Sequence, residues 1–109
     1  MSDDRLPTHI WVEAKIRESH MNGSPIFVVH KGNKTGGLVL LKLNNLDGVC
    51  RLLTQQRDLD GNLGWMNPLD EDVSETAADD YIRKELEFDS DLWVLEVETK
   101  ELLNPFDTL

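Results

Sequence analysis

Leu38-Val39-Leu40-Leu41, followed by Lys42-Leu43, is the stretch of sequence that decides the fold, and its first four residues form the longest purely aliphatic run in the chain. Apolar and polar residues do not alternate here, so an extended strand of this sequence is apolar on both faces. Such a strand needs cover on both sides, which predicts a position at the centre of a sheet. The run is far too short to cross a bilayer, which needs about 20 residues, and we expect no membrane association.

Shorter apolar runs on both sides of this stretch predict the remaining strands. Turn-forming residues 31–37 separate it from Ile26–Val29, and this pattern indicates an antiparallel hairpin. Val49–Gln56 and a short Leu63–Met66 follow further turns, and Leu92–Glu98 alternates, with Trp93, Leu95 and Val97 on one face.

Two segments have helical spacing. The first runs from about His9 to Asn22, with Thr8 as the expected N-cap and Gly23 just past the end. Its predicted core face consists of Ile10, Ala14 and Met21, with Trp11 beside them. The second runs from Ser74 or Glu75 to about Glu87, with Ala78, Tyr81, Ile82 and Leu86 at helical spacing.

The order of these elements predicts an α/β (α+β) fold, in which two helices cover one mainly antiparallel sheet of four to five strands. The order is helix, three strands, a possible fourth strand, helix, strand. A length of 109 residues fits a single domain, residues 1–109, with one buried core. The tail that begins at Leu102 is expected to dock through Phe106.

Charge is divided unevenly along the chain. Residues 1–57 carry eight Lys or Arg against five Asp or Glu, whereas residues 58–109 carry three against sixteen, and the net charge is −10. This excess of carboxylates repels polyanions and argues against nucleic-acid binding. The negative charge favours a basic protein as the partner, and the oligomeric state does not follow from it.

The start of the chain, Met-Ser-Asp-Asp-Arg, has no basic region followed by an apolar one, so we expect a cytoplasmic protein without a secretory signal. Cys50 is the only cysteine, which excludes an internal disulfide. Its apolar neighbours indicate a small buried residue. No cofactor, resident metal or catalytic residue is predicted.

Arg57, Asp58 and Asp60 are the first candidate binding residues, in a loop that continues with Gly61-Asn62. The loop starts like a calcium-binding EF-hand but lacks the glycine and the closing glutamate that such a site needs. A hairpin turn explains the same residues. Two further candidates are Trp65, an aromatic residue beside the loop that is suited to anchoring a partner, and His9, which shares a helix face with Glu13.

Four segments resemble a known family. They are Arg5-Leu-Pro-Thr-His-Ile-Trp-Val-Glu-Ala, Leu40-Leu41-Lys42-Leu43, Arg57-Asp-Leu-Asp-Gly-Asn-Leu-Gly-Trp65 and Asp91-Leu-Trp-Val-Leu-Glu-Val-Glu98. In this order they resemble a small, uncharacterised alphaproteobacterial family catalogued as domain of unknown function 1491. The resemblance implies a bacterial cytoplasmic protein with a compact α/β fold, and it implies no activity.

Two functions therefore stay open. The first is a small acidic binding or adaptor domain that contacts a basic protein through its second half. The alternative is a metal-assisted or phosphate-handling enzyme that uses the Arg57–Asp60 loop together with His9. The enzyme requires these side chains to converge in one concave pocket, and the adaptor requires the carboxylates to form one continuous surface.

Overall fold

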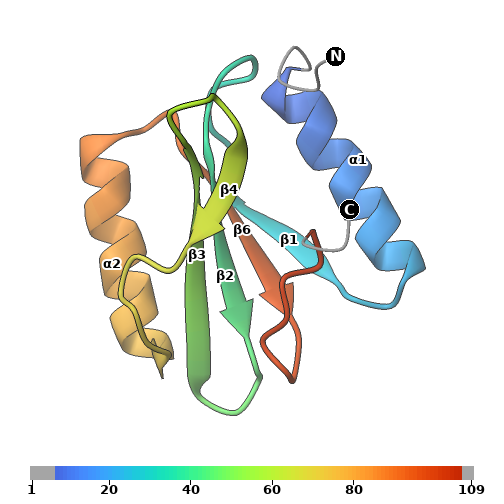
Figure 1. Ribbon diagram of the computed structural model, residues 1–109. Coiled ribbons are helices and arrows are strands. Elements are labelled where there is room, and N and C mark those ends of the chain that lie inside the picture. Colours follow the sequence, from blue (N-terminus) through green and yellow to red (C-terminus); the bar gives the residue numbers. More distant parts are fainter. Residues whose placement is uncertain (1–6, 107–109) are drawn as a thin grey trace.

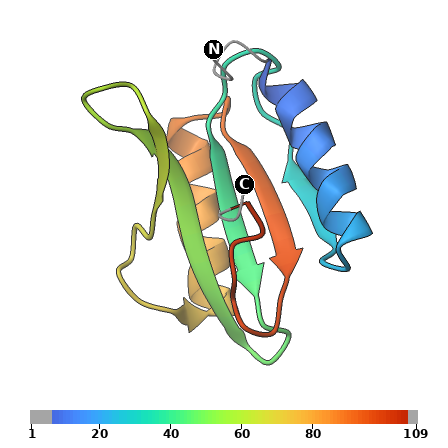
Figure 2. The same ribbon diagram turned by 45° about the vertical axis from the view of Figure 1, so that its right-hand side comes forward.

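The computed structural model describes residues 7–106, so the charged N-terminal arm and residues 107–109 lie outside the described part. Two helices lie on opposite faces of a six-stranded sheet (Figures 1 and 2). The elements are α1 (Thr8–Met21), β1 (Ile26–His30), β2 (Val39–Asn44), β3 (Val49–Arg57), β4 (Leu63–Met66), β5 (Val73–Ser74), α2 (Glu75–Phe88) and β6 (Trp93–Glu98). The predicted α+β class and the element order are confirmed.

The aliphatic stretch forms β2, in the middle of the sheet. The strands are ordered β1-β6-β2-β3-β4, with the short β5 also pairing with β3. β2 runs antiparallel to β3 and parallel to β6, and the other pairs are antiparallel. Every residue of β2 is buried, because helices or loops cover both faces of the strand.

The predicted hairpin between β1 and β2 is wrong, since β6 lies between the two strands. Residues 31–37 are instead a loop that crosses the start of β6. The Trp93 indole Nε1 donates to the Asn33 carbonyl at 2.8 Å, and the Asn33 amide donates to the Asp91 carbonyl at 2.9 Å. A side chain at Gly32 or Gly37 would collide with the backbone of Asp91, so these glycines allow the close crossing.

Alternation along β2 and β6 creates two apolar cores. Leu41 and Leu43 belong to the core under α1 and the C-terminal tail, together with Trp93 and Leu95. Leu40 faces the other way, into the core under α2. That second core consists of Leu40, Cys50, Leu52, Ala78, Ile82, Leu92 and Val94.

The predicted core face of α1 is wrong except at Trp11, which packs against the core. Ile10 and Ala14 are exposed, and Met21 is 82% exposed, whereas Val12 and Ser19 are buried. Apolar residues lie all round this helix, so the sequence pattern does not determine which face is buried. Contact with the sheet determines it. Thr8 is also not the N-cap, which is Pro7; the Thr8 hydroxyl donates to the Gly37 carbonyl at 2.9 Å and ties α1 to the crossing loop.

The predictions for α2 and the tail are confirmed. The Ser74 hydroxyl caps α2 by accepting from the Ala77 amide at 3.1 Å. Phe106 is buried against two tryptophans, with ring centroids 5.4 Å from Trp11 and 6.0 Å from Trp65. The tail therefore closes the part of the α1-side core that the helix does not reach.

Candidate functional site

Arg57, Asp58 and Asp60 lie together at the exposed turn between β3 and β4. The Asp58 carboxylate accepts from the amides of Asn62 and Asp60, both at 2.9 Å, and these hydrogen bonds hold the pKa of Asp58 below its usual value. Arg57 donates to the Gly61 carbonyl at 2.7 Å. The polar groups of the loop thus hold its own backbone in a hairpin turn, as in an Asx turn.

The other two candidates take part in different contacts. The His9 ring nitrogen Nδ1 lies 3.0 Å from the Lys34 carbonyl, at the start of α1, whereas the β3–β4 turn projects away from that helix (Figure 2). Trp65 is half-buried and stacks on Phe106. Within residues 7–106, no three His, Cys, Asp or Glu side chains are placed to hold a metal ion.

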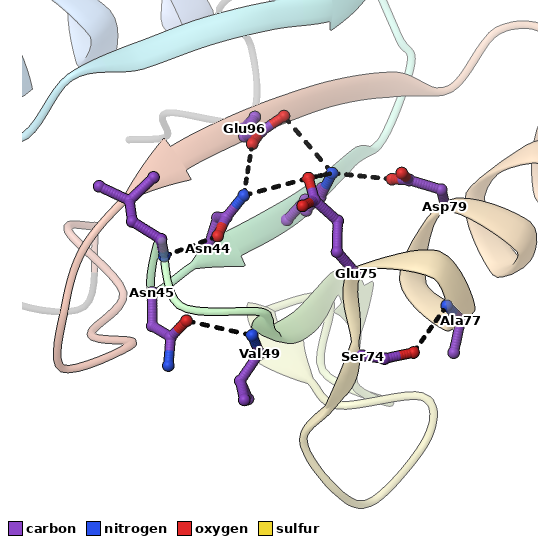
Figure 3. A network of polar contacts seen from close by, with 10 residues as sticks. Asn44, Asn45, Val49, Ser74, Glu75, Ala77, Asp79 and Glu96 are labelled. Carbon is purple, nitrogen blue, oxygen red and sulfur yellow. Dashed lines mark hydrogen bonds and ion pairs between the residues drawn. The ribbon is translucent and has the colours of Figure 1, made fainter.

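A different polar cluster, which the sequence did not indicate, lies between the sheet and α2. Lys42 of β2 is buried, and its Nζ lies 2.8 Å from Glu75, 2.8 Å from Asp79 and 3.6 Å from Glu96. Asn44 donates to Glu75 at 3.2 Å and to Glu96 at 2.9 Å. Figure 3 shows Glu75 and Asp79, which come from α2, and Glu96, which comes from β6, meeting at one network of polar contacts that includes Asn44. We call Lys42, Asn44, Glu75, Asp79 and Glu96 the Lys42 cluster.

Electrostatics in the cluster favour the charged lysine. Burial alone lowers the pKa of Lys42, but hydrogen bonds to Asp79 and Glu75 and the charge of Glu96 outweigh it, so the pKa lies above its ordinary value. One ammonium faces three carboxylates, which leaves the cluster with an excess of negative charge when all are ionised. This excess lies at the edge of α2, beside a groove.

The missed signal was Lys42 itself. A charged residue inside a doubly buried strand requires a counter-charge. Lys42 pairs in register with Glu96 across the parallel β2–β6 ladder, so their side chains share a face. The sequence does not show that β2 and β6 are neighbours, so the pairing of Lys42 with Glu96 could not be predicted from it.

A groove of about 630 Å³ runs along α2, on the side toward β1. We call it the α2 groove; it is lined by Val29, Lys42, Asp79, Ile82, Arg83, Leu86, Glu87 and Glu96. Its walls are apolar where Val29, Ile82 and Leu86 meet, and charged at the Lys42 cluster. Its volume is in the range of ligand sites, about 300–1,000 Å³.

Acidic side chains gather on the same side of the molecule. Residues 70–91, which contain α2, carry ten Asp or Glu against two Lys or Arg, and nine of the ten acids are exposed. Some of this charge is compensated: Asp72 pairs with Arg51 at 2.7 Å, and Arg83 pairs with Asp80 at 3.0 Å and with Glu87 at 3.9 Å. A clear surplus of carboxylates is left along α2.

None of the helices within residues 7–106 combines the length and the apolar character that crossing a bilayer requires.

Comparisons with known proteins agree on one family. The model of "Protein of unknown function (DUF1491)" matches residues 6–107. A crystal structure of a DUF1491 family protein from Caulobacter crescentus CB15 is similar, with 34% identity, a TM-score of 0.78, and coverage of 87% of this chain and 89% of that one. An NMR structure of a DUF1491 family protein from the same organism has 32% identity, a TM-score of 0.81 and 94% coverage of both chains.

A solution structure of a protein from A. tumefaciens is also similar, with 26% identity, a TM-score of 0.73, and coverage of 87% of this chain and 86% of that one. No curated protein matches the chain. The family match over nearly the whole sequence, together with these structures, shows that the chain belongs to the DUF1491 family of proteins of unknown function.

Proposed function

We propose that this protein is a small binding domain that accepts a basic, partly apolar segment of a partner protein in the α2 groove. The observation that carries the proposal is the coincidence of an open apolar groove with the most acidic segment of the chain. Exposed apolar surface beside charge of one sign is typical of a protein interaction site. The proposal includes a cytoplasmic location, with which the buried free thiol of the single cysteine is compatible.

Charge selects the class of partner. Around the groove, five carboxylates from Glu75, Asp79, Asp80, Glu87 and Glu96 face two cations, Lys42 and Arg83. Lys42 is buried beneath the carboxylates, so an approaching molecule meets the acids first. A segment with Lys or Arg is attracted to this rim, whereas a nucleic acid is repelled.

The alternative, an enzyme that uses the Arg57–Asp60 loop, has less support. Asp58 and Arg57 hydrogen-bond to the backbone of their own turn, and His9 contacts the Lys34 loop instead. Neither the α2 groove nor the smaller pockets beside the tail and beside β4 are lined by these residues.

Selection from a random library of displayed peptides tests the proposal. We expect the selected peptides to combine Lys or Arg with large apolar residues. Their dissociation constants should rise at least tenfold for the Val29→Arg variant, because the arginine side chain fills the apolar part of the groove. Leu59→Arg is the matched control, because Leu59 lies fully exposed in the β3–β4 turn and the substitution changes the net charge equally.

Binding that weakens equally in Val29→Arg and Leu59→Arg would show that net charge alone attracts the peptides. Selected peptides that are acidic, or whose affinity Val29→Arg leaves unchanged, would also contradict docking in the α2 groove.

A further inference from the structure

We infer that the partner segment docks as an amphipathic α-helix that lies beside α2, over β1 and β6. This inference rests on the proposed function and specifies the conformation of the partner. It follows from the space beside α2, from the apolar surface exposed there, and from the state of the β1 edge.

The space beside α2 has the width of one helix. α2 packs on β2 and β3 through Ala78 and Ile82, whose core includes Leu40 and Leu52. Two steps across the sheet, from β2 through β6 to β1, cover about 10 Å at the usual strand spacing. Packed helices lie about 8–10 Å apart. A second helix parallel or antiparallel to α2 therefore fits over β1 and the side of β6 next to it, where residues 7–106 supply no helix.

The uncovered part of the sheet is apolar. Phe27 pairs in register with Glu96, so its side chain lies on the α2 side, and it is 49% exposed. Val29 lines the α2 groove and is 53% exposed. Leu86 contributes a half-buried side chain from α2. These three residues offer an apolar strip to a helix whose own apolar residues recur every three or four positions.

The β1 edge is poorly suited to the competing mode, in which an extended segment adds a strand to the sheet. The His20 ring nitrogen Nε2 lies 3.2 Å from both the amide nitrogen and the carbonyl oxygen of Ile26, so it accepts from the amide or donates to the carbonyl, depending on the tautomer of the ring, and it covers this part of the edge. The register of β1 also shifts between Val28 and His30, as in a β-bulge. Bulges and blocked backbone groups are devices that protect edge strands from pairing.

Charge disfavours a second copy of this chain as the occupant. Each copy carries a net charge of −10, and the groove lies next to its most acidic segment. A basic helix can place Lys or Arg against Glu87, Asp79 and Glu96 while its apolar face covers Val29. Complementary charge of this kind orients a docking helix and speeds its association.

Two peptides of identical composition, made only of leucine and lysine, test the inference. One has leucines at helical spacing, i, i+3, i+4 and i+7, and the other alternates leucine and lysine as in a strand. We expect the helical isomer to bind the protein at least tenfold more tightly, as measured by isothermal titration calorimetry. Val29→Arg should abolish this preference and Leu59→Arg should leave it intact, with both variants checked for folding by NMR spectra.

The outcomes separate the inference from the proposed function. If the alternating isomer binds as tightly or more tightly, and Val29→Arg weakens it, the groove is a docking site but the helical partner is wrong. If Val29→Arg changes the binding of neither isomer, both proposals fail. A concentration-dependent dimer that Val29→Arg dissociates, seen by sedimentation, would identify a second copy as the occupant and overturn the inference.

Discussion

Lys42 is the residue on which the α2 side of the molecule depends most. Its side chain is 5% exposed, while those of Glu75, Asp79 and Glu96 are 48%, 57% and 23% exposed. Burying an ammonium group without partners costs much free energy, so a lysine at this position requires the neighbouring carboxylates. The same contacts fix the N-terminal half of α2 against β2 and β6.

Replacing Lys42 with methionine should therefore destabilise the protein, by about 2 kcal/mol in urea-induced unfolding. This is less than the 3–5 kcal/mol typical of a broken buried pair, because two of the three carboxylates can be hydrated. Adding Glu96→Gln should recover part of the loss, since the least exposed carboxylate is then neutral. A Lys42→Met variant as stable as the wild type would show that the cluster does not stabilise the fold.

The pH dependence of this contribution follows from the raised pKa of Lys42. Because the folded-state pKa lies above the unfolded value of about 10.4, the stabilisation is fully present below that value and is lost as the pH rises through the folded pKa. The stability difference between wild type and Lys42→Met should thus stay constant from pH 7 to pH 10.

Cys50 should be inert toward thiol reagents in the folded protein. It is fully buried, and this burial raises its pKa to about 11, so the reactive thiolate is scarce at pH 8. We expect a chromogenic disulfide reagent to label it slowly in buffer and rapidly above the urea midpoint. Rapid stoichiometric labelling of the folded chain would contradict this placement, and a small-molecule thiol serves as the rate control.

The loop that joins β1 to β2 decides the order of the strands. It must cross the start of β6, and the crossing brings Gly37 against the Asp91 carbonyl and the Trp93 ring. Nearby Gly36 faces open space. The loop therefore contains two glycines that are needed for close approach, Gly32 and Gly37, and one, Gly36, that is not.

Gly37→Ala should lower the free energy of unfolding by about 2 kcal/mol or more, because the added methyl group displaces the backbone of the crossing. Gly36→Ala should be neutral or slightly stabilising, since it removes freedom only from the unfolded chain. Thermal and urea unfolding of the two variants measure the difference. Equal stabilities would mean that the loop does not pass over β6 as closely as described.

The whole molecule combines a small size with a large negative charge. Its radius of gyration is 13.3 Å and its net charge is −10. At low salt the screening length is about 30 Å, longer than the protein radius, so the carboxylates repel one another across the molecule. At 0.1 M salt this length falls to about 10 Å.

The melting temperature should thus rise by a few degrees between 10 mM and 300 mM sodium chloride, which corresponds to about 0.5 kcal/mol. The double variant Glu71→Gln and Glu101→Gln should show a smaller rise, because it removes two exposed acids that take part in no ion pair among residues 7–106. A melting temperature that falls with salt would indicate that ion pairs outweigh the repulsion.

Local patterns in the sequence were sufficient for the elements themselves. The unbroken aliphatic run placed β2 at the centre of the sheet, and Ser74 with Ala78 and Ile82 predicted α2 and its buried face. These features depend on residues a few positions apart, whose side chains share a face by backbone geometry alone. The acidic character of the second half also came directly from the sequence.

The neighbours of each element were decided only by the tertiary structure. Val39 pairs with Trp93, and Lys42 with Glu96, across more than fifty residues of chain, and no local period specifies such a pairing. The same applies to α1, whose apolar residues surround the helix until the sheet buries Val12. The Lys42 cluster and the α2 groove exist because β6 inserts between β1 and β2. That arrangement buries the apolar face of β6, Trp93, Leu95 and Val97, in one core with Val39, Leu41 and Leu43 of β2.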